Sequence, residues 1–326
     1  MRALRPIAIL TGGLIFAWLV WEIGVDAIMA QLRQLSWRLP LILAPQAVTN
    51  VFKTAGWRAA FPGRYPRFGL LFSIRLAGEA VNETTPTATM GGDALKAFLL
   101  ARLRGGVPIE EGLVSVLVAK TALVAALGGF IAGALVLAWA LSDVPGSMLV
   151  LLAVLAAYMA ASTAGFMWVQ LRGAARLGGR ALAWIGLGER VAAVAGQLDA
   201  DLRRFYRDQR GRGLASLGHS LVGWATGAFE TWLMLALLGS PVSLMTALVI
   251  EAGAAGVRAV GFLIPGSLGV LEGGIVGLFA LLRMDPATGL AFGIARRIRE
   301  AFWILVGYAC LAFLRSPRAD KSEPGA

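Results

Sequence analysis

Cysteine and histidine are almost absent from this sequence, which has one of each, Cys310 and His219, in 326 residues. A single cysteine excludes a disulfide within the chain, and the pair cannot build the usual zinc, haem or iron–sulfur sites. The sequence also lacks a phosphate-binding loop of the Walker type, so direct use of ATP is not expected. We therefore expect no metal and no cofactor, and we assign no catalytic residue.

Charged residues are also scarce, at 15%, whereas 58% of residues are hydrophobic and the mean hydropathy is +0.72. A soluble fold of this size could not bury so much apolar surface, so the composition predicts an all-α polytopic membrane protein. The net charge of +11 would suggest nucleic acid as the partner of a soluble protein. In a membrane protein it is explained by cytoplasmic loops and anionic headgroups, so we expect membrane lipids and no nucleic acid as partners.

Apolar runs of roughly 20 residues are long enough to cross a bilayer and predict about six transmembrane helices. They lie near 6–24, 39–60, 112–141, 146–171, 214–238 and 287–314. The segment 172–213 has nine arginines and four acidic residues, which indicates a basic cytoplasmic loop. It divides a single transmembrane domain, 1–316, into a first half, 1–171, and a second half, 214–316. Residues 317–326 form a cytoplasmic tail.

Two further apolar segments, 68–103 and 243–283, are interrupted by proline and glycine. With the basic loop and both termini in the cytoplasm, the topology is consistent only if each segment enters and leaves on one side. The first hairpin then opens from the cytoplasm and the second from the periplasm, in an inverted-repeat-like arrangement that suits alternating access. A re-entrant and a fully spanning hairpin give the same topology, so both forms stay open. The predicted break residues are Pro86, Gly91, Gly92, Pro265, Gly269, Gly273 and Gly274.

Charged residues stand beside both breaks, where each costs at least about 2.5 kcal/mol at membrane depth. Arg75 and Glu79 share one helix face in the first hairpin, and Glu251 and Arg258 share one in the second. Either pair alone could be self-neutralising and simply allow a polar helix inside the bundle. A pair at each break favours a substrate site instead.

The restart of each broken helix exposes backbone N–H groups that favour an anion, such as a lipid phosphate. Asp93 and Glu272 lie at these restarts, where N-terminal capping is the favoured interpretation and proton coupling the alternative. Lys120, inside an apolar span, is either the partner of Glu79, Glu83 or Glu230 or a headgroup ligand. The predicted substrate-binding residues are Arg75, Glu79, Asn82, Glu83, Asp93, Lys96, Lys120, Glu251, Arg258, Glu272, Arg296 and Arg299.

Three motifs resemble the lysylphosphatidylglycerol synthase transmembrane (flippase-like) family: the charged, glycine-rich segment 78–96, the Pro-Gly-x-x-Gly-x-x-Glu-Gly-Gly element within 262–274, and 296–300. Within the family, the hopanoid-biosynthesis-associated branch is the most similar. The resemblance implies a multi-pass protein of the bacterial inner membrane that moves or handles a lipid or a polyprenyl-linked molecule. We do not expect lysyl transfer, because bifunctional members perform it in a soluble aminoacyltransferase domain. The polar residues 82–85 depart from the family pattern.

Three functions fit these features. In a lipid translocator, headgroups of an anionic or polyprenyl-linked lipid would enter a polar cavity between the hairpins while the tails stay in the bilayer. A membrane-embedded transferase acting on a lipid-linked substrate would need carboxylates such as Glu79, Glu83 and Asp93 to hold Mg²⁺. An accessory subunit of a lipid (hopanoid) biosynthesis complex would bind lipid-biosynthesis enzymes. We favour the translocator over an enzyme, and the sequence leaves the oligomeric state open.

Overall fold

Every regular element in the described part of the chain is an α-helix, which confirms the predicted all-α class. The computed structural model describes residues 38–63, 65–85, 90–102, 107–141, 144–172, 189–261, 267 and 269–315. The predicted span 6–24, Pro86, Pro265 and the tail 317–326 lie outside these residues. The helices are α3 (Leu39–Ala59), α4 (Phe68–Thr84), α5 (Met90–Arg102), α6 (Ile109–Leu141), α7 (Gly146–Arg172), α9 (Glu189–Asp208), α10 (Arg210–Leu237), α11 (Leu244–Val260), α12 (Val270–Leu281) and α13 (Pro286–Arg315).

Two of the described helices, α6 and α7, are long and apolar enough to cross a membrane by length and composition. The helices α3, α10 and α13 have comparable lengths but a more polar composition. Apolar side chains also cover the outside of the bundle: Trp139 on α6, Val150 on α7 and Leu305 on α13 are largely exposed. Such a surface suits hydrocarbon rather than water.

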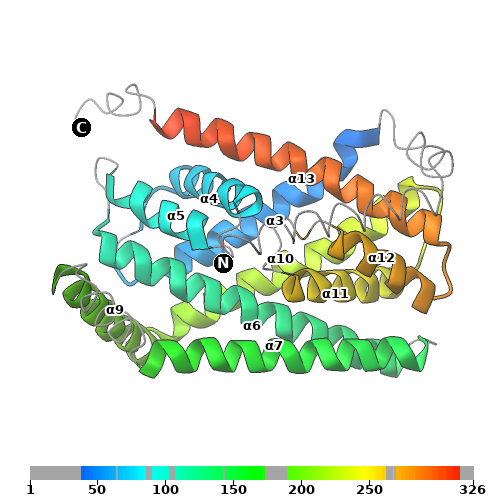
Figure 1. The fold of residues 1–326 in the computed structure, drawn as a ribbon, viewed down its shortest axis with the longest axis horizontal. Coiled ribbons are helices and arrows are strands. Elements are labelled where there is room, and N and C mark those ends of the chain that lie inside the picture. The colour runs from blue at the N-terminus through cyan, green and yellow to red at the C-terminus, as the bar shows by residue number, and fades with distance from the viewer. Residues whose placement is uncertain are drawn as a thin grey trace, which may run out of the picture.

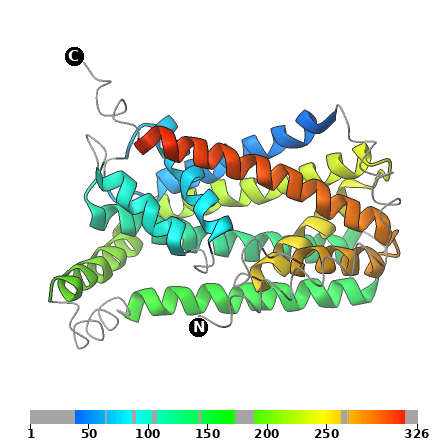
Figure 2. The same ribbon diagram turned by 45° about the horizontal axis from the view of Figure 1, so that its top comes forward.

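The long helices run roughly side by side along the long axis of the molecule (Figure 1). The main pairs are α3 with α10, α6 with α7, and α4 with α13. The largest apolar core joins α6, α7 and α10 to α11, α12 and α13, through residues such as Leu152, Ile250, Phe279 and Phe292. In both ribbon views, α4 and α5 lie toward the end of the bundle where α9 lies, and α11 and α12 toward the opposite end (Figures 1 and 2).

The predicted breaks need one correction. Gly91 and Gly92 belong to the first turn of α5, and Gly273 and Gly274 lie inside α12, so these four glycines are helical. The first interruption instead begins at Thr85, whose backbone is extended after the end of α4. In the second, Gly269 has a φ of 74° before α12, a conformation that glycine adopts without strain.

The helical glycines of the first hairpin allow close backbone contact rather than a break. A Cβ atom on Gly92 would lie only 1.9 Å from the carbonyl oxygen of Gly78 on α4. The backbones of α4 and α5 therefore touch, with the Asn82 side chain beside them, since its Oδ1 accepts a hydrogen bond from Gly92 N at 2.7 Å.

The helix α9 lies across one end of the bundle (Figure 1). Leu202 and Phe205 are buried on one face, against Val114 and Val118 of α6. The basic segment 172–213 is therefore largely helical where it is described, and only part of it is a loop.

The start of α13 gives a stability prediction. Asp285 precedes Pro286, and its carboxylate accepts hydrogen bonds from Ala287 N at 3.2 Å, Thr288 N at 3.0 Å and Thr288 Oγ1 at 2.9 Å. We expect Asp285→Ala to lower the free energy of unfolding by about 1 kcal/mol, as for other lost helix caps, and thermal unfolding in detergent measures it. The same hydrogen bonds make the cap dependent on pH. Slight burial raises the pKa of Asp285, but the hydrogen bonds from Ala287 and Thr288 outweigh burial and leave the pKa below its ordinary value. The cap's contribution should therefore disappear as pH falls through the folded-state pKa, and Asp285→Ala should show no such loss.

Candidate functional site

A polar cavity of about 250 Å³ lies where α3, α4, α10, α11 and α13 meet. Ten of its lining residues carry formal charge, five of each sign, and all come from these helices. They are Lys53, Arg75, Glu79, Glu83, Glu230, Glu251, Arg258, Arg296, Arg299 and Glu300. So many charges in the middle of an apolar helical bundle are unusual, because each requires a partner or a polar surrounding.

Two arginines of α13 are neutralised by buried acids from the second half of the chain. Arg296 Nη1 contacts Glu251 Oε2 of α11 at 2.5 Å, and Glu251 also accepts a hydrogen bond from Thr231 at 2.7 Å. Arg299 pairs with Glu230 of α10. The two glutamates are only 4% and 2% exposed, so these pairs fix how α10, α11 and α13 pack.

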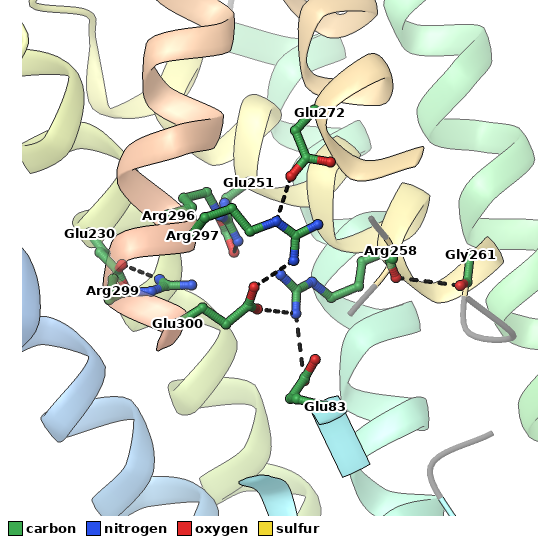
Figure 3. A network of polar contacts seen from close by, with 11 residues as sticks. Glu83, Glu230, Glu251, Arg258, Gly261, Glu272, Arg296, Arg297, Arg299 and Glu300 are labelled. Carbon is green, nitrogen blue, oxygen red and sulfur yellow. Dashed lines mark hydrogen bonds and ion pairs between the residues drawn. The ribbon is translucent and has the colours of Figure 1, made fainter. Parts of the chain in front are cut away.

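A second set of charges connects the two hairpins through α13 (Figure 3). Arg258 Nη1, on α11, lies 2.5 Å from Glu300 Oε1 and 3.6 Å from Glu83 Oε1 at the end of α4. Arg297 binds Glu300 Oε2 at 2.7 Å and Glu272 Oε1 of α12 at 2.5 Å. The interrupted ends of α4 and α11 thus meet at ion pairs that α13 organises.

A third cluster joins the first hairpin to α6. Lys96 Nζ lies 2.6 Å from Glu79 Oε1 and 3.0 Å from Asp93 Oδ1, while Lys120 Nζ lies 2.6 Å from Asp93 Oδ2. The acidic partner of Lys120 is therefore Asp93, and not Glu79, Glu83 or Glu230 as the sequence suggested.

Capping was predicted for Glu272 and Asp93, and the structure confirms it for Glu272. Glu272 Oε2 accepts a hydrogen bond from Gly269 N at 2.8 Å, so Glu272 does cap the start of α12. At the start of α5 the backbone N–H of Gly92 is bound by Asn82 instead, and the Asp93 carboxylate is engaged by two lysines.

The charged residues of each hairpin find their hydrogen-bond and ion-pair partners on other helices. Arg75 Nη1 donates to Asn50 Oδ1 of α3 at 3.1 Å, whereas Glu79 pairs with Lys96 of α5. Glu251 and Arg258 likewise find their partners on α13. Pairs between helices hold the bundle together in a way that pairs along one helix would not.

Seven of the twelve predicted substrate-binding residues line the cavity, and the other five lie in the charged clusters next to it. Asn82, Asp93, Lys96, Lys120 and Glu272 belong to the flanking clusters. The prediction omitted Asn50, Lys53, Glu230 and Glu300, which do line the cavity. Polar residues at 46, 49, 50 and 53 follow helical spacing in the predicted span 39–60, and this stripe could have indicated that α3 faces a polar site.

The carboxylates that a transferase would need for Mg²⁺ are bound to cations. Asp93 contacts two lysines, Glu79 contacts Lys96, and Glu83 is paired with Arg258. Within the described ranges, no three or more Asp, Glu, His or Cys side chains are grouped so that they could hold a metal ion.

The apolar exterior, the two hydrophobic helices and the buried charges define an all-helical membrane protein with a polar interior. A family model, the lysylphosphatidylglycerol synthase transmembrane region, matches residues 6–307. The chain belongs to this family, as the motifs predicted, and the family indicates a function related to membrane lipids. Neither the curated proteins nor the solved structures gave a match to the chain.

Proposed function

We propose that the protein is a lipid translocator of the bacterial inner membrane that moves an anionic or polyprenyl-linked lipid through the charged cavity. The headgroup would occupy the cavity while the tails remain in the bilayer. The observation that supports this most directly is the position of the cavity, between two interrupted helical hairpins whose inner ends meet at Glu83 and Arg258.

The proposal includes a topology. Five of the six predicted spans coincide with α3, α6, α7, α10 and α13, and the hairpins α4–α5 and α11–α12 lie toward opposite ends of the bundle (Figure 1). We place both termini and the basic segment 172–213 in the cytoplasm and treat the hairpins as re-entrant inverted repeats. Alternating access would then require the two hairpins to open in turn, which the Glu83–Arg258 contact is positioned to control.

The substrate-binding residues of the proposal are the cavity-lining members of the predicted set, Arg75, Glu79, Glu83, Glu251, Arg258, Arg296 and Arg299. Not all can bind substrate equally. Glu251, Arg296 and Arg299 belong to two ion pairs between buried side chains, whereas Glu79 is 38% exposed in its side chain and Arg258 25%. Substrate contacts should concentrate on the residues outside these two buried ion pairs.

The test is transbilayer movement of labelled anionic and zwitterionic lipids in liposomes that contain the purified protein. We expect Glu79→Gln and Arg258→Gln to slow movement at least tenfold, since each removes a charge that faces the cavity. Arg203→Gln, on the exposed face of α9, also removes one charge and should match the wild type. All variants must remain monodisperse. If the folded wild type moves none of the lipids, or if both cavity variants move them at the wild-type rate, the proposal is wrong.

A further inference from the structure

One wall of the cavity carries donors without acidic partners. Along α3, Gln46, Asn50 and Lys53 all line the cavity, one helical turn apart. Arg75 of α4 donates to Asn50 Oδ1, and Lys53 follows Asn50 by one turn of α3, so both cations lie near one asparagine. The helix α3 itself has no acidic residue.

The acids of the cavity are committed elsewhere. Each lining glutamate pairs with a cation other than Lys53 or Arg75: Glu79 with Lys96, Glu83 and Glu300 with Arg258, Glu230 with Arg299, and Glu251 with Arg296. Among the described residues, neither Lys53 nor Arg75 forms an ion pair with a carboxylate. Two neighbouring positive charges therefore lack a described carboxylate at ion-pair distance inside the bundle, which is unfavourable unless an anion joins them.

Lys53 is held in position by groups that do not neutralise it. Its Nζ lies 4.5 Å from the centre of the Trp224 ring, a cation–π contact with α10. Its stem passes close to Gly223, where an added Cβ would lie 3.3 Å from Lys53 Cγ. The lysine is thus oriented in advance of any ligand.

Asn50 contributes a third donor. The residue is 4% exposed, its Oδ1 accepts from Arg75, and its buried Nδ2 has no hydrogen-bond partner in the described part of the chain. Arg75 is 7% exposed and makes one side-chain hydrogen bond to the described residues, although a guanidinium has five N–H donors. Asn50, Lys53 and Arg75 therefore bring donors to one wall of the cavity, and the described residues supply no carboxylate at ion-pair distance for them.

We infer that Asn50, Lys53 and Arg75 form a binding site for a phosphate group, either the phosphate of a lipid headgroup or free phosphate. A tetrahedral phosphate offers several acceptor oxygens to three donors, and a guanidinium beside an ammonium is a strong combination for it. This inference rests on the proposed function where it identifies the phosphate as the part of the lipid substrate that the cavity holds. The phosphate site can also be tested by itself, without any transport.

Binding to the purified full-length protein in a neutral detergent tests the site. The probes are dioctanoyl phosphatidic acid, dioctanoylglycerol, octanoate and inorganic phosphate, measured by calorimetry. We expect phosphatidic acid to bind, and Lys53→Gln and Arg75→Gln each to weaken it at least tenfold, as loss of a charged hydrogen bond predicts. Dioctanoylglycerol, which lacks the phosphate, should not bind, and Arg203→Gln should bind like the wild type.

The probes distinguish the sources of the phosphate. Tight binding of phosphatidic acid with weak binding of inorganic phosphate assigns a lipid headgroup, whereas equal affinities assign free phosphate. Equal binding of dioctanoylglycerol or octanoate, or unchanged affinity in both Gln variants, overturns the inference.

The stability of the ligand-free protein provides an independent check of the site. Lys53 has no acidic partner among the described residues, so removing its charge should break no ion pair. Lys53→Gln should leave the melting temperature of the ligand-free protein equal to or above that of the wild type, and a clear decrease contradicts the unpaired charge.

Failure here is distinguishable from failure of the proposed function. If liposomes show lipid movement that Lys53→Gln does not slow, the phosphate site is wrong and the translocator remains. If phosphatidic acid binds through Lys53 and Arg75 but no lipid moves, the site remains and the translocator is wrong.

Discussion

We expect Gly92→Ala to destabilise the protein by more than about 3 kcal/mol, although it adds a single methyl group, and to abolish any lipid movement. The new Cβ would lie 1.9 Å from the carbonyl oxygen of Gly78 and 2.6 Å from the Asn82 side chain. The first contact is with backbone, so no rotamer change relieves it, and α4 and α5 must separate. Separation would also pull Lys96 away from Glu79 beside the cavity.

Gly129→Ala is the matched control. Gly129 lies inside α6, and a Cβ there would meet nothing within 4 Å. Alanine is favoured over glycine in a helix by up to about 1 kcal/mol, so this variant should be as stable as the wild type or more so. Thermal unfolding of both variants in the same detergent makes the comparison. Equal melting temperatures would show that the α4–α5 contact is not close, and the account of the first hairpin would be wrong.

The positions of the helices could be predicted from the sequence because hydrophobic run length is a local property. The predicted spans 39–60, 112–141 and 146–171 differ from α3, α6 and α7 by only a few residues at each end. Both interruptions were also predicted, but Gly91 and Gly92 were assigned to the break because glycine usually disfavours a helix. Here the close approach of two backbones requires the small residue inside the helix.

The ion pairs could not be predicted in the same way. Spacing along one helix identifies Arg75 with Glu79 as neighbours, but it contains no information on which other helix lies opposite. Once α5 and α3 pack against α4, Lys96 and Asn50 offer these side chains buried partners. Lys53 was overlooked for a related reason. Its significance lies in the absence of an acidic partner among the described residues, which appears only when the other charges have been placed.

The second large effect is expected at the buried ion pair between Arg296 of α13 and Glu251 of α11. Arg296→Met should lower the free energy of unfolding by about 3–5 kcal/mol, because it leaves the Glu251 carboxylate buried without its cation. Thr231 would remain as a single hydrogen-bond donor to Glu251, which is too little to replace a guanidinium. Equilibrium unfolding in detergent measures the loss, and we expect no measurable change for Arg207→Met, whose pair with Asp208 is fully exposed.

The double variant Arg296→Met/Glu251→Gln separates a structural pair from a substrate-binding one. It removes the unpaired charge, so it should recover most of the stability lost in Arg296→Met. If the pair is structural, the recovered protein also moves lipid at close to the wild-type rate, and Glu251 and Arg296 leave the set of substrate contacts. If stability returns but movement does not, the charges of Glu251 and Arg296 are needed for transport itself, as substrate contacts would be. A double variant less stable than Arg296→Met would contradict the assigned pairing itself.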